Sequence, residues 1–138
     1  MKVVLDTNVL AVAISRKSRY YPIWQSLRKG DFEMLVTTDI LLEYDEILTD
    51  YLSPEVAQNV LGGLELLPNL TLITKYYYWN LITPDPDDDK FVDCAIAGGA
   101  DFMVTDDGHF RVLKDIPFPR VVILTADEFL EMVLKEQF

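Results

Sequence analysis

The sequence predicts an α/β fold in which helices cover a largely parallel β-sheet. Short apolar runs, typical of strands buried on both faces, alternate along the chain with segments that have helical period or a helix cap. Two of these runs end in aspartate, at Asp6 and at Asp106-Asp107. Ligands bind beyond the carboxyl ends of the strands in open parallel sheets, so the same pattern predicts where a functional site lies.

The first half of the chain is expected to contain two strands and four helices. The strands are the apolar runs at 2–5 and 32–37, and the helices lie at 9–14, 22–29, 40–51 and 54–67. Gly30 stands where a helix commonly ends. Asp39 can cap the third helix, whose apolar residues recur at helical intervals. Ser53 and Pro54 open the fourth helix as its cap and first-turn residue.

The second half repeats the alternation of strands and helices. Strands are expected at 70–73, 102–105 and 121–124, and helices at 88–97, 110–114 and 126–135. Gly98-Gly99 ends the first of these helices, and Thr125 caps the last. The aromatic run from Tyr76 to Trp79 precedes a loop rich in Pro and Asp. We expect two of its four rings in the core and two on the surface.

Length and composition indicate one soluble, cytoplasmic domain spanning residues 1–138. Half of the residues are apolar, which suffices for one core. No apolar stretch approaches the roughly 18 residues of a membrane-spanning helix, and the N-terminus does not resemble a signal peptide. The single Cys94 excludes an intramolecular disulfide, and the single His109 excludes a histidine-rich zinc site. Any bound metal must therefore be held mainly by oxygen.

The net charge of −11 argues, taken alone, against a nucleic-acid-binding protein, because such proteins usually present a basic face to phosphates. Net charge describes solubility and long-range steering, however, and bound divalent cations can invert the sign at a site. The positions of the acidic residues therefore matter more than their number.

Several acidic residues occupy positions that could form a site, and each has a plainer explanation. Asp6 and Asp107 follow buried strands, where aspartate is also favoured as a turn or cap residue. Asp89 and Asp93 are four apart and share a helix face, but acidic residues are also favoured near a helix N-terminus. By pattern alone, Glu43 flanks an apolar helix stripe and points to water.

Three segments stand out for their order and spacing: VVLDTNVL at 3–10, TTDILLEYDEIL at 37–48 and DPDDDKFVDCAIAGGADFMVTDD at 85–107. Together they resemble PIN-domain proteins, especially the toxin ribonucleases of bacterial toxin-antitoxin modules. The resemblance covers essentially the whole chain. It implies a PIN-like, Rossmann-like fold: a three-layer α/β/α sandwich with a five-stranded parallel sheet.

The resemblance also implies roles for particular residues. The catalytic, metal-binding acids would be Asp6, Glu43, Asp89 and Asp107, with Asp93 as an additional metal ligand and with Asn8 and Thr105 supporting them. Many members have Gly where this chain has Asp106, and we expect Asp107 to be the carboxylate that points inward. Glu43 thereby moves from the helix flank to the site.

Carboxylates that converge in this way need a compensating charge. At a mean spacing of about 5 Å and an effective dielectric near 20, each pair repels by roughly 3 kcal/mol. Either the acids are protonated, with strongly raised pKa values, or a divalent cation neutralises them. An all-oxygen ligand set suits Mg²⁺ or Mn²⁺, and the sequence does not decide between one ion and two.

The predicted function is Mg²⁺- or Mn²⁺-dependent endoribonuclease activity on single-stranded RNA, as the toxin of a toxin-antitoxin module. Arg16, Lys17 and Arg19 could contact phosphates beside Asp6, although they could equally be solvated surface charges. The resemblance implies a homodimer and an antitoxin partner. Two alternatives stay open: a catalytically idle protein-binding module, and a metal-dependent hydrolase of small phosphoesters. The sequence does not distinguish RNA from DNA as the substrate.

Overall fold

Five parallel strands form one sheet in the computed structural model of the chain, which describes residues 1–82 and 86–138. The strands are β1 (Lys2–Leu5), β2 (Glu33–Val36), β3 (Leu70–Leu72), β4 (Phe102–Val104) and β5 (Ile123–Leu124). Their order across the sheet is β3-β2-β1-β4-β5, and every neighbouring pair is parallel. The strand order therefore reverses between β1 and β4, which makes this pair the switch point where parallel sheets bind ligands.

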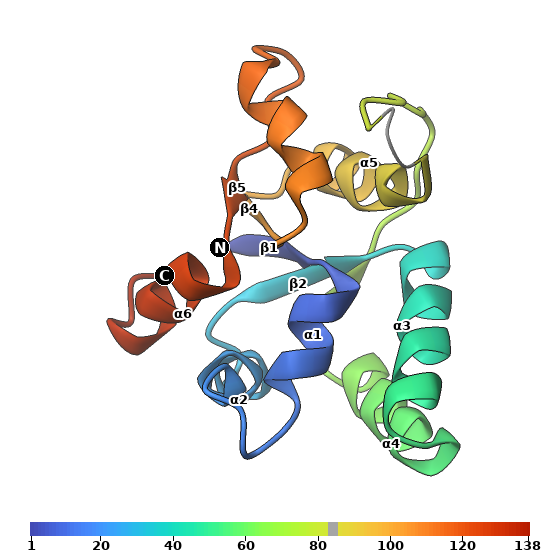
Figure 1. The fold of residues 1–138 in the computed structure, drawn as a ribbon, viewed down its shortest axis with the longest axis vertical. Helices are drawn as coiled ribbons and strands as arrows, with labels where there is room; N and C mark the ends of the chain where they lie inside the picture. Colours follow the sequence, from blue (N-terminus) through green and yellow to red (C-terminus); the bar gives the residue numbers. More distant parts are fainter. Residues whose placement is uncertain (83–85) are drawn as a thin grey trace.

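Helices cover both faces of this sheet. The α-helices are α1 (Thr7–Ala13), α2 (Tyr21–Lys29), α3 (Thr38–Tyr51), α4 (Pro54–Glu65), α5 (Asp89–Gly98) and α6 (Ala126–Leu134), and the 3-10 helices are η1 (Pro86–Asp88) and η2 (Gly108–Asp115). Helix α5 packs against β1, β2 and β4, whereas α1, α2 and α6 pack together on the opposite side of the sheet, as Figure 1 shows. The predicted three-layer α/β/α sandwich is confirmed.

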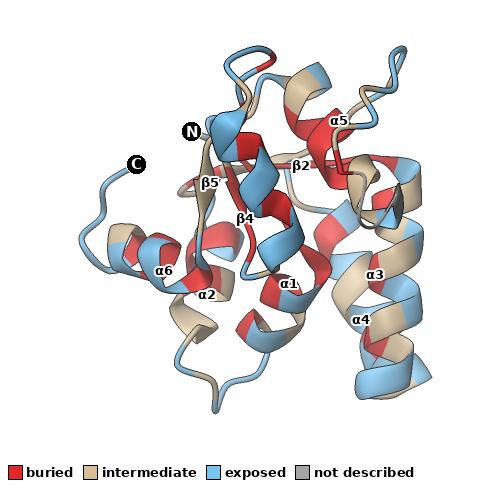
Figure 2. Cartoon of the chain, turned by 45° about the horizontal axis from the view of Figure 1, so that its top comes forward, coloured by how far each residue is buried: buried red, intermediate tan, exposed pale blue. Residues whose placement is uncertain are grey.

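The core lies between these layers and is centred on the three middle strands. Their side chains from Val3 to Leu5, from Met34 to Val36, and at Met103 and Val104 are all buried. Figure 2 shows the buried residues gathered on β4, β2 and the inward sides of the helices. The short apolar runs of the sequence are therefore strands buried on both faces, as their lack of alternation predicts.

Most predicted helix ends are confirmed. Gly30 and Gly99 end α2 and α5 in the left-handed conformation, with φ of 83° and 64°. Ser53 caps α4, and Thr125 caps α6 in a capping box with Glu128. Strand β1 has the predicted bounds, the other four strands are one or two residues shorter than predicted, and the helix expected at 110–114 is the longer 3-10 helix η2.

The predicted cap of α3 was wrong. The capping residue is Thr37, whose side chain accepts a hydrogen bond from the backbone N–H of Ile40 at 3.3 Å. Asp39 lies in the first turn, where its carboxylate binds Lys75 Nζ at 2.7 Å. The helix begins earlier than its apolar stripe, because the stripe marks buried residues and not the first turn.

The expectation for the aromatic run was also wrong. Tyr76, Tyr77 and Tyr78 are all exposed, Tyr76 to 91%, and Trp79 is half-buried. Residues 74–82 form neither helix nor strand, and Ile82 is the residue of this stretch that enters the core. The loop predicted to follow includes residues 83–85, and these, with Asp85 of the third motif, lie outside the described residues.

In the described ranges, 1–82 and 86–138, no helix combines the length and apolar character that a bilayer crossing requires.

A close approach at Gly98 leads to a first prediction. A Cβ added there would lie 2.6 Å from Leu35 Cδ1 and 3.1 Å from Ile73 Cδ1, and Leu35 is itself buried. We expect Gly98→Ala to lower the free energy of unfolding by about 1–3 kcal/mol through overpacking. Gly62→Ala, in open space within α4, is the matched control and should stabilise by about 0.5–1 kcal/mol. Urea denaturation measures both, and a Gly98→Ala variant as stable as wild type would contradict the packing.

Candidate metal centre at the carboxyl edge of the sheet

Asp6 lies at the carboxyl end of β1 and begins α1. Its backbone N–H donates to the Val104 carbonyl at 3.0 Å, which continues the pairing of β1 with β4. One carboxylate oxygen, Oδ1, accepts from the backbone N–H of Thr7 at 2.7 Å, and Oδ2 accepts from Thr105 Oγ1 at 2.7 Å. Both oxygens are thus held at the switch point, and the side chain is almost fully buried.

Glu43 reaches this edge from α3. The neighbouring Tyr44 is fully buried and donates its hydroxyl to the Leu5 carbonyl at 2.5 Å, which fixes α3 against the end of β1. Thr7 donates its hydroxyl to the Glu43 carboxylate, and Lys90 Nζ lies 2.8 Å from Glu43 Oε1. Glu43 is therefore engaged with residues next to Asp6, and not the solvated flank that the helical pattern alone favoured.

Asp106 and Asp107 follow β4 and make different contacts. Asp106 Oδ1 accepts from the backbone N–H of Ala126, the first residue of α6, at 2.9 Å. Asp107 donates its backbone N–H to Thr105 Oγ1 at 3.0 Å, and its carboxylate caps η2. Both line a cavity of about 300 Å³ with Asp6. Each carboxylate accepts a backbone N–H, and the charge of Asp107 is among those that raise the pKa of Asp6.

Asp89 and Asp93 form a second group, on α5. Asp89 Oδ1 accepts from the backbone N–H of Ile82 at 2.8 Å, and Asp93 Oδ1 accepts from that of Trp79 at 3.1 Å. Both line a cavity of about 240 Å³ that also includes Lys90. Lys90, bound to Glu43, therefore lies between the two groups of acids.

The electrostatics reflect burial and crowding. The pKa of Asp6 is raised by burial and by the charges of Glu43 and Asp107, although its hydrogen bonds from Thr105 and Thr7 oppose the shift. The pKa of Asp93 is also raised, chiefly by burial. These carboxylates are costly to ionise without a nearby cation.

Lys90 supplies part of that compensation. Burial lowers its pKa, but the hydrogen bond to Glu43 and the charges of Glu43, Asp87 and Asp39 outweigh burial and raise it. The ammonium group is therefore held in its charged form beside the acids.

The residues present fit a divalent cation. Asp6, Glu43 and Asp107 offer carboxylate oxygens, the ligands that Mg²⁺ and Mn²⁺ prefer. A cation among them would relieve the repulsion that raises the pKa of Asp6. Asp89 and Asp93, beyond Lys90, offer the same ligand type to the other side of this edge.

The sequence did not predict the contacts that two further residues make with the acids of this edge. Thr7 contacts both Asp6, through its backbone N–H, and Glu43, through its hydroxyl. Lys90 neutralises Glu43 from the first turn of α5. Their only sequence signal is position: each directly follows a candidate acid, Asp6 or Asp89.

The predicted supporting and substrate-binding residues lie near the same edge. Thr105 is buried and holds Asp6, and Asn8 lines the cavity beside Asp6 and Asp107. Tyr20 lines the same cavity, which places the preceding loop beside it. In that loop, Arg16 and Lys17 are exposed. Arg19 is also exposed but pairs with Asp127 at 3.1 Å.

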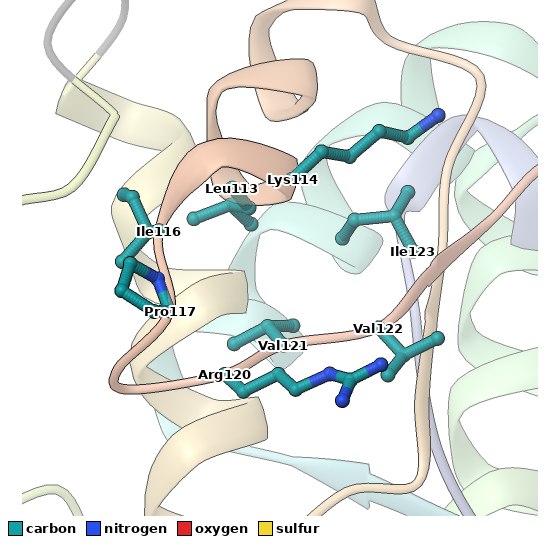
Figure 3. Close-up of a pocket in the computed structure, with 8 residues that line it drawn as sticks. All are labelled: Leu113, Lys114, Ile116, Pro117, Arg120, Val121, Val122 and Ile123. Carbon is teal, nitrogen blue, oxygen red and sulfur yellow. The ribbon is translucent and has the colours of Figure 1, made fainter.

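A separate cavity of about 480 Å³ lies between η2 and β5. It is lined by Leu113, Lys114, Ile116, Pro117 and the segment 120–123. Figure 3 shows the basic side chains of Lys114 and Arg120 on opposite sides of an apolar wall. None of the candidate acids lines it, so it is distinct from the carboxylate edge.

The fold and this edge together define a class: α/β proteins with a carboxylate cluster at the switch point of a parallel sheet. The PIN domain family model matches residues 2–109, and the chain therefore belongs to the PIN domain family.

Solved structures support the fold assignment. The chain is similar to one in VapBC2 from Rickettsia felis bound to a DNA fragment from their promoter, with a TM-score of 0.62, 24% identity, and coverage of 91% of this chain and 98% of that chain. It is also similar to a chain in DNA-bound VapBC from Salmonella typhimurium, with a TM-score of 0.57, 19% identity and the same coverage, 91% and 98%. A comparison with curated proteins finds no match.

The raised pKa of Asp6 leads to a second prediction. Since the folded-state pKa lies above the ordinary value of 3.8, ionising Asp6 costs stability as the pH rises through the raised value, and the cost is absent below 3.8. We expect Asp6→Asn to have a higher Tm than wild type at neutral pH in EDTA, and the difference to shrink in acid. Thermal denaturation across a pH series measures it. A variant less stable than wild type at every pH would show that Asp6 is not electrostatically strained.

Proposed function

We propose that the chain is a cytoplasmic, metal-dependent endoribonuclease of single-stranded RNA, acting as one domain over residues 1–138. The observation that carries the proposal is the convergence of Asp6, Glu43 and Asp107 at the switch point, where burial and mutual repulsion raise the pKa of Asp6. A protein without a bound cation would gain stability by losing these acids. Their presence together favours a metal-dependent nuclease over an idle binding module.

In this proposal, Asp6, Glu43 and Asp107 hold Mg²⁺ or Mn²⁺, and Asp89 and Asp93 complete the ligand set from α5. An ion held there would lower the pKa of a bound water and would offset the charge on the leaving oxygen of the phosphodiester. Thr105 and Thr7 orient the Asp6 carboxylate through hydrogen bonds to each oxygen. Lys90 holds Glu43 toward the edge and keeps positive charge beside it.

The substrate path is proposed to run along α1. The cavity that contains Asp6 and Asp107 extends to Tyr20, so a strand leaving the carboxylates would pass the loop of Arg16, Lys17 and Arg19. Basic side chains there would offset part of the net charge of −11. A path open along a helix favours a polymer over a small phosphoester.

We further propose that the chain is the toxin of a toxin-antitoxin module, that it forms a homodimer and that it binds an antitoxin protein. The support is the VapBC identity of both similar structures, each a complex bound to DNA. The exposed Tyr76, Tyr77 and Tyr78 offer an apolar surface that a second subunit or the antitoxin could cover.

A third prediction tests the nuclease directly. Asp6→Asn and Asp89→Asn should each lower Mn²⁺-dependent cleavage of a mixed single-stranded RNA by more than about 100-fold, because each removes a metal ligand. Cleavage is measured on gels with labelled RNA, with and without EDTA.

Asp45→Asn is the matched control, because Asp45 lies two residues from Glu43 on α3 but is exposed and accepts a hydrogen bond from Thr49 Oγ1 at 3.3 Å, one turn along the same helix. It should cleave like wild type. If wild type is inert toward RNA and single-stranded DNA but hydrolyses a small phosphoester, the polymer is the wrong substrate. If wild type binds metal but hydrolyses none of these substrates, the result would favour a catalytically idle protein-binding module over a nuclease.

A fourth prediction concerns the basic loop. Each phosphate contact on a single strand contributes about 0.7 to the slope of log affinity against log salt, so an Arg16→Ala/Lys17→Ala/Arg19→Ala variant should lower the slope by up to about 2. Fluorescence anisotropy in EDTA measures binding without cleavage. The control, Arg28→Ala/Lys29→Ala/Lys135→Ala, removes equal charge at the C-terminal ends of α2 and α6. Equal slopes of log affinity against log salt in the two triple variants would show that the loop of Arg16, Lys17 and Arg19 does not contact the RNA phosphates.

A further inference from the structure

His109, the only histidine of the chain, faces two carboxylates at the carboxyl edge. Its Nδ1 lies 3.2 Å from Asp88 Oδ2 and 3.6 Å from Asp107 Oδ1. One ligand atom from each of the three residues lies within 4.8 Å of the other two. Two oxygens and an imidazole nitrogen that converge in this way need either a shared proton or a cation between them.

Buried packing fixes this convergence of segments that are far apart in the sequence. Asp88 directly precedes α5, and Asp107 caps η2 while accepting the backbone N–H of His109 at 2.9 Å. Phe91 of α5 and Phe110 of η2 are buried, and their rings meet edge to face at 6.5 Å. The aromatic contact therefore holds the two segments that carry the three polar side chains.

The spacing suits metal coordination. Adjacent ligands of a six-coordinate ion with bonds of about 2.1 Å lie about 3 Å apart, so separations of 3.2 Å and 3.6 Å require little movement. The side chains of His109 and Asp107 are 46% and 34% exposed, so an ion from solvent can reach them. Imidazole is a good ligand for transition ions, whereas Mg²⁺ prefers oxygen.

We propose that His109, with Asp88 and Asp107, binds a divalent transition metal ion such as Mn²⁺, and that Asp107 joins this position to the Asp6 cluster. The proposal rests on the proposed function for its role, since it adds a nitrogen ligand and a metal preference to the same edge. Its consequence is selectivity: the chain binds Mn²⁺ more tightly than Mg²⁺, and the difference depends on His109. The competing explanation is a hydrogen bond from the imidazole Nδ1–H of His109 to Asp88, with no metal involved.

The test, our fifth prediction, uses the full chain without a histidine tag and the metals alone. With ¹⁵N-histidine labelling, a nitrogen coupled to Mn²⁺ in pulsed electron paramagnetic resonance must belong to His109, because the chain has no other histidine. We expect this coupling in wild type and its loss in His109→Gln. Mn²⁺ affinity should fall at least about tenfold in His109→Gln, and Mg²⁺ affinity much less.

Two further variants sharpen the result. Asp88→Asn should also weaken Mn²⁺ binding while leaving His109 in place. Lys114→Gln, at the far end of η2, should change neither the coupling nor the affinity, and Tm values establish that each variant is folded.

Bound Mn²⁺ without histidine coupling, or equal Mn²⁺ affinity in wild type and His109→Gln, would overturn the proposal. The measurement uses no RNA, so it stands apart from the ribonuclease test. Absence of cleavage with the coupling present would count against the ribonuclease alone.

Discussion

The buried carboxylate of Asp6 is the constraint on which the rest of this edge depends. A charge in such a position is tolerated only when its surroundings compensate it, because an isolated buried ion loses several kcal/mol of hydration. The chain meets this demand locally, through the Thr7 amide at the start of α1 and the Thr105 hydroxyl at the end of β4. The Thr7 amide is the next residue along the chain, whereas the Thr105 hydroxyl reaches Asp6 because β1 and β4 are neighbours in the sheet.

Other carboxylates lie around Asp6, and lysine side chains neutralise only some of them. Lys90 pairs with Glu43, and Lys75 pairs with Asp39. Asp6, by contrast, has neutral hydrogen-bond donors and two acidic neighbours. An edge arranged in this way lowers the stability of the protein, and the cation of the proposed function would relieve that cost.

The sequence predicted well what depends on local pattern. Apolar runs identified all five strands, and glycine and hydroxyl residues identified most helix ends, because these features act within a few residues. It predicted poorly what depends on distant contacts. The stripe of α3 showed that Tyr44 is buried but not that Glu43 meets Thr7 and Lys90 across the fold. The resemblance implied that Glu43 is a site residue, but not which residues it contacts. Likewise, Asp88 and His109 are 21 residues apart, and no spacing rule links them. Two of the four aromatic rings after β3 were expected in the core, because hydrophobicity alone does not show that a segment lies outside the layers.

Gly98 lets α5 lie close to the sheet, because a Cβ at this position would lie 2.6 Å from Leu35 Cδ1. The helix is ten residues long, or about 15 Å at its usual rise per residue. Its far end carries Asp89 and Lys90. Because a helix is stiff along its axis, α5 acts as a rigid spacer between Gly98, which packs on the sheet, and the charged residues Asp89 and Lys90. The distance between Gly98 and the sheet therefore sets the position of Lys90 relative to Glu43. A methyl group added at Gly98 would displace α5 and move the ammonium group of Lys90 away from its position beside Glu43.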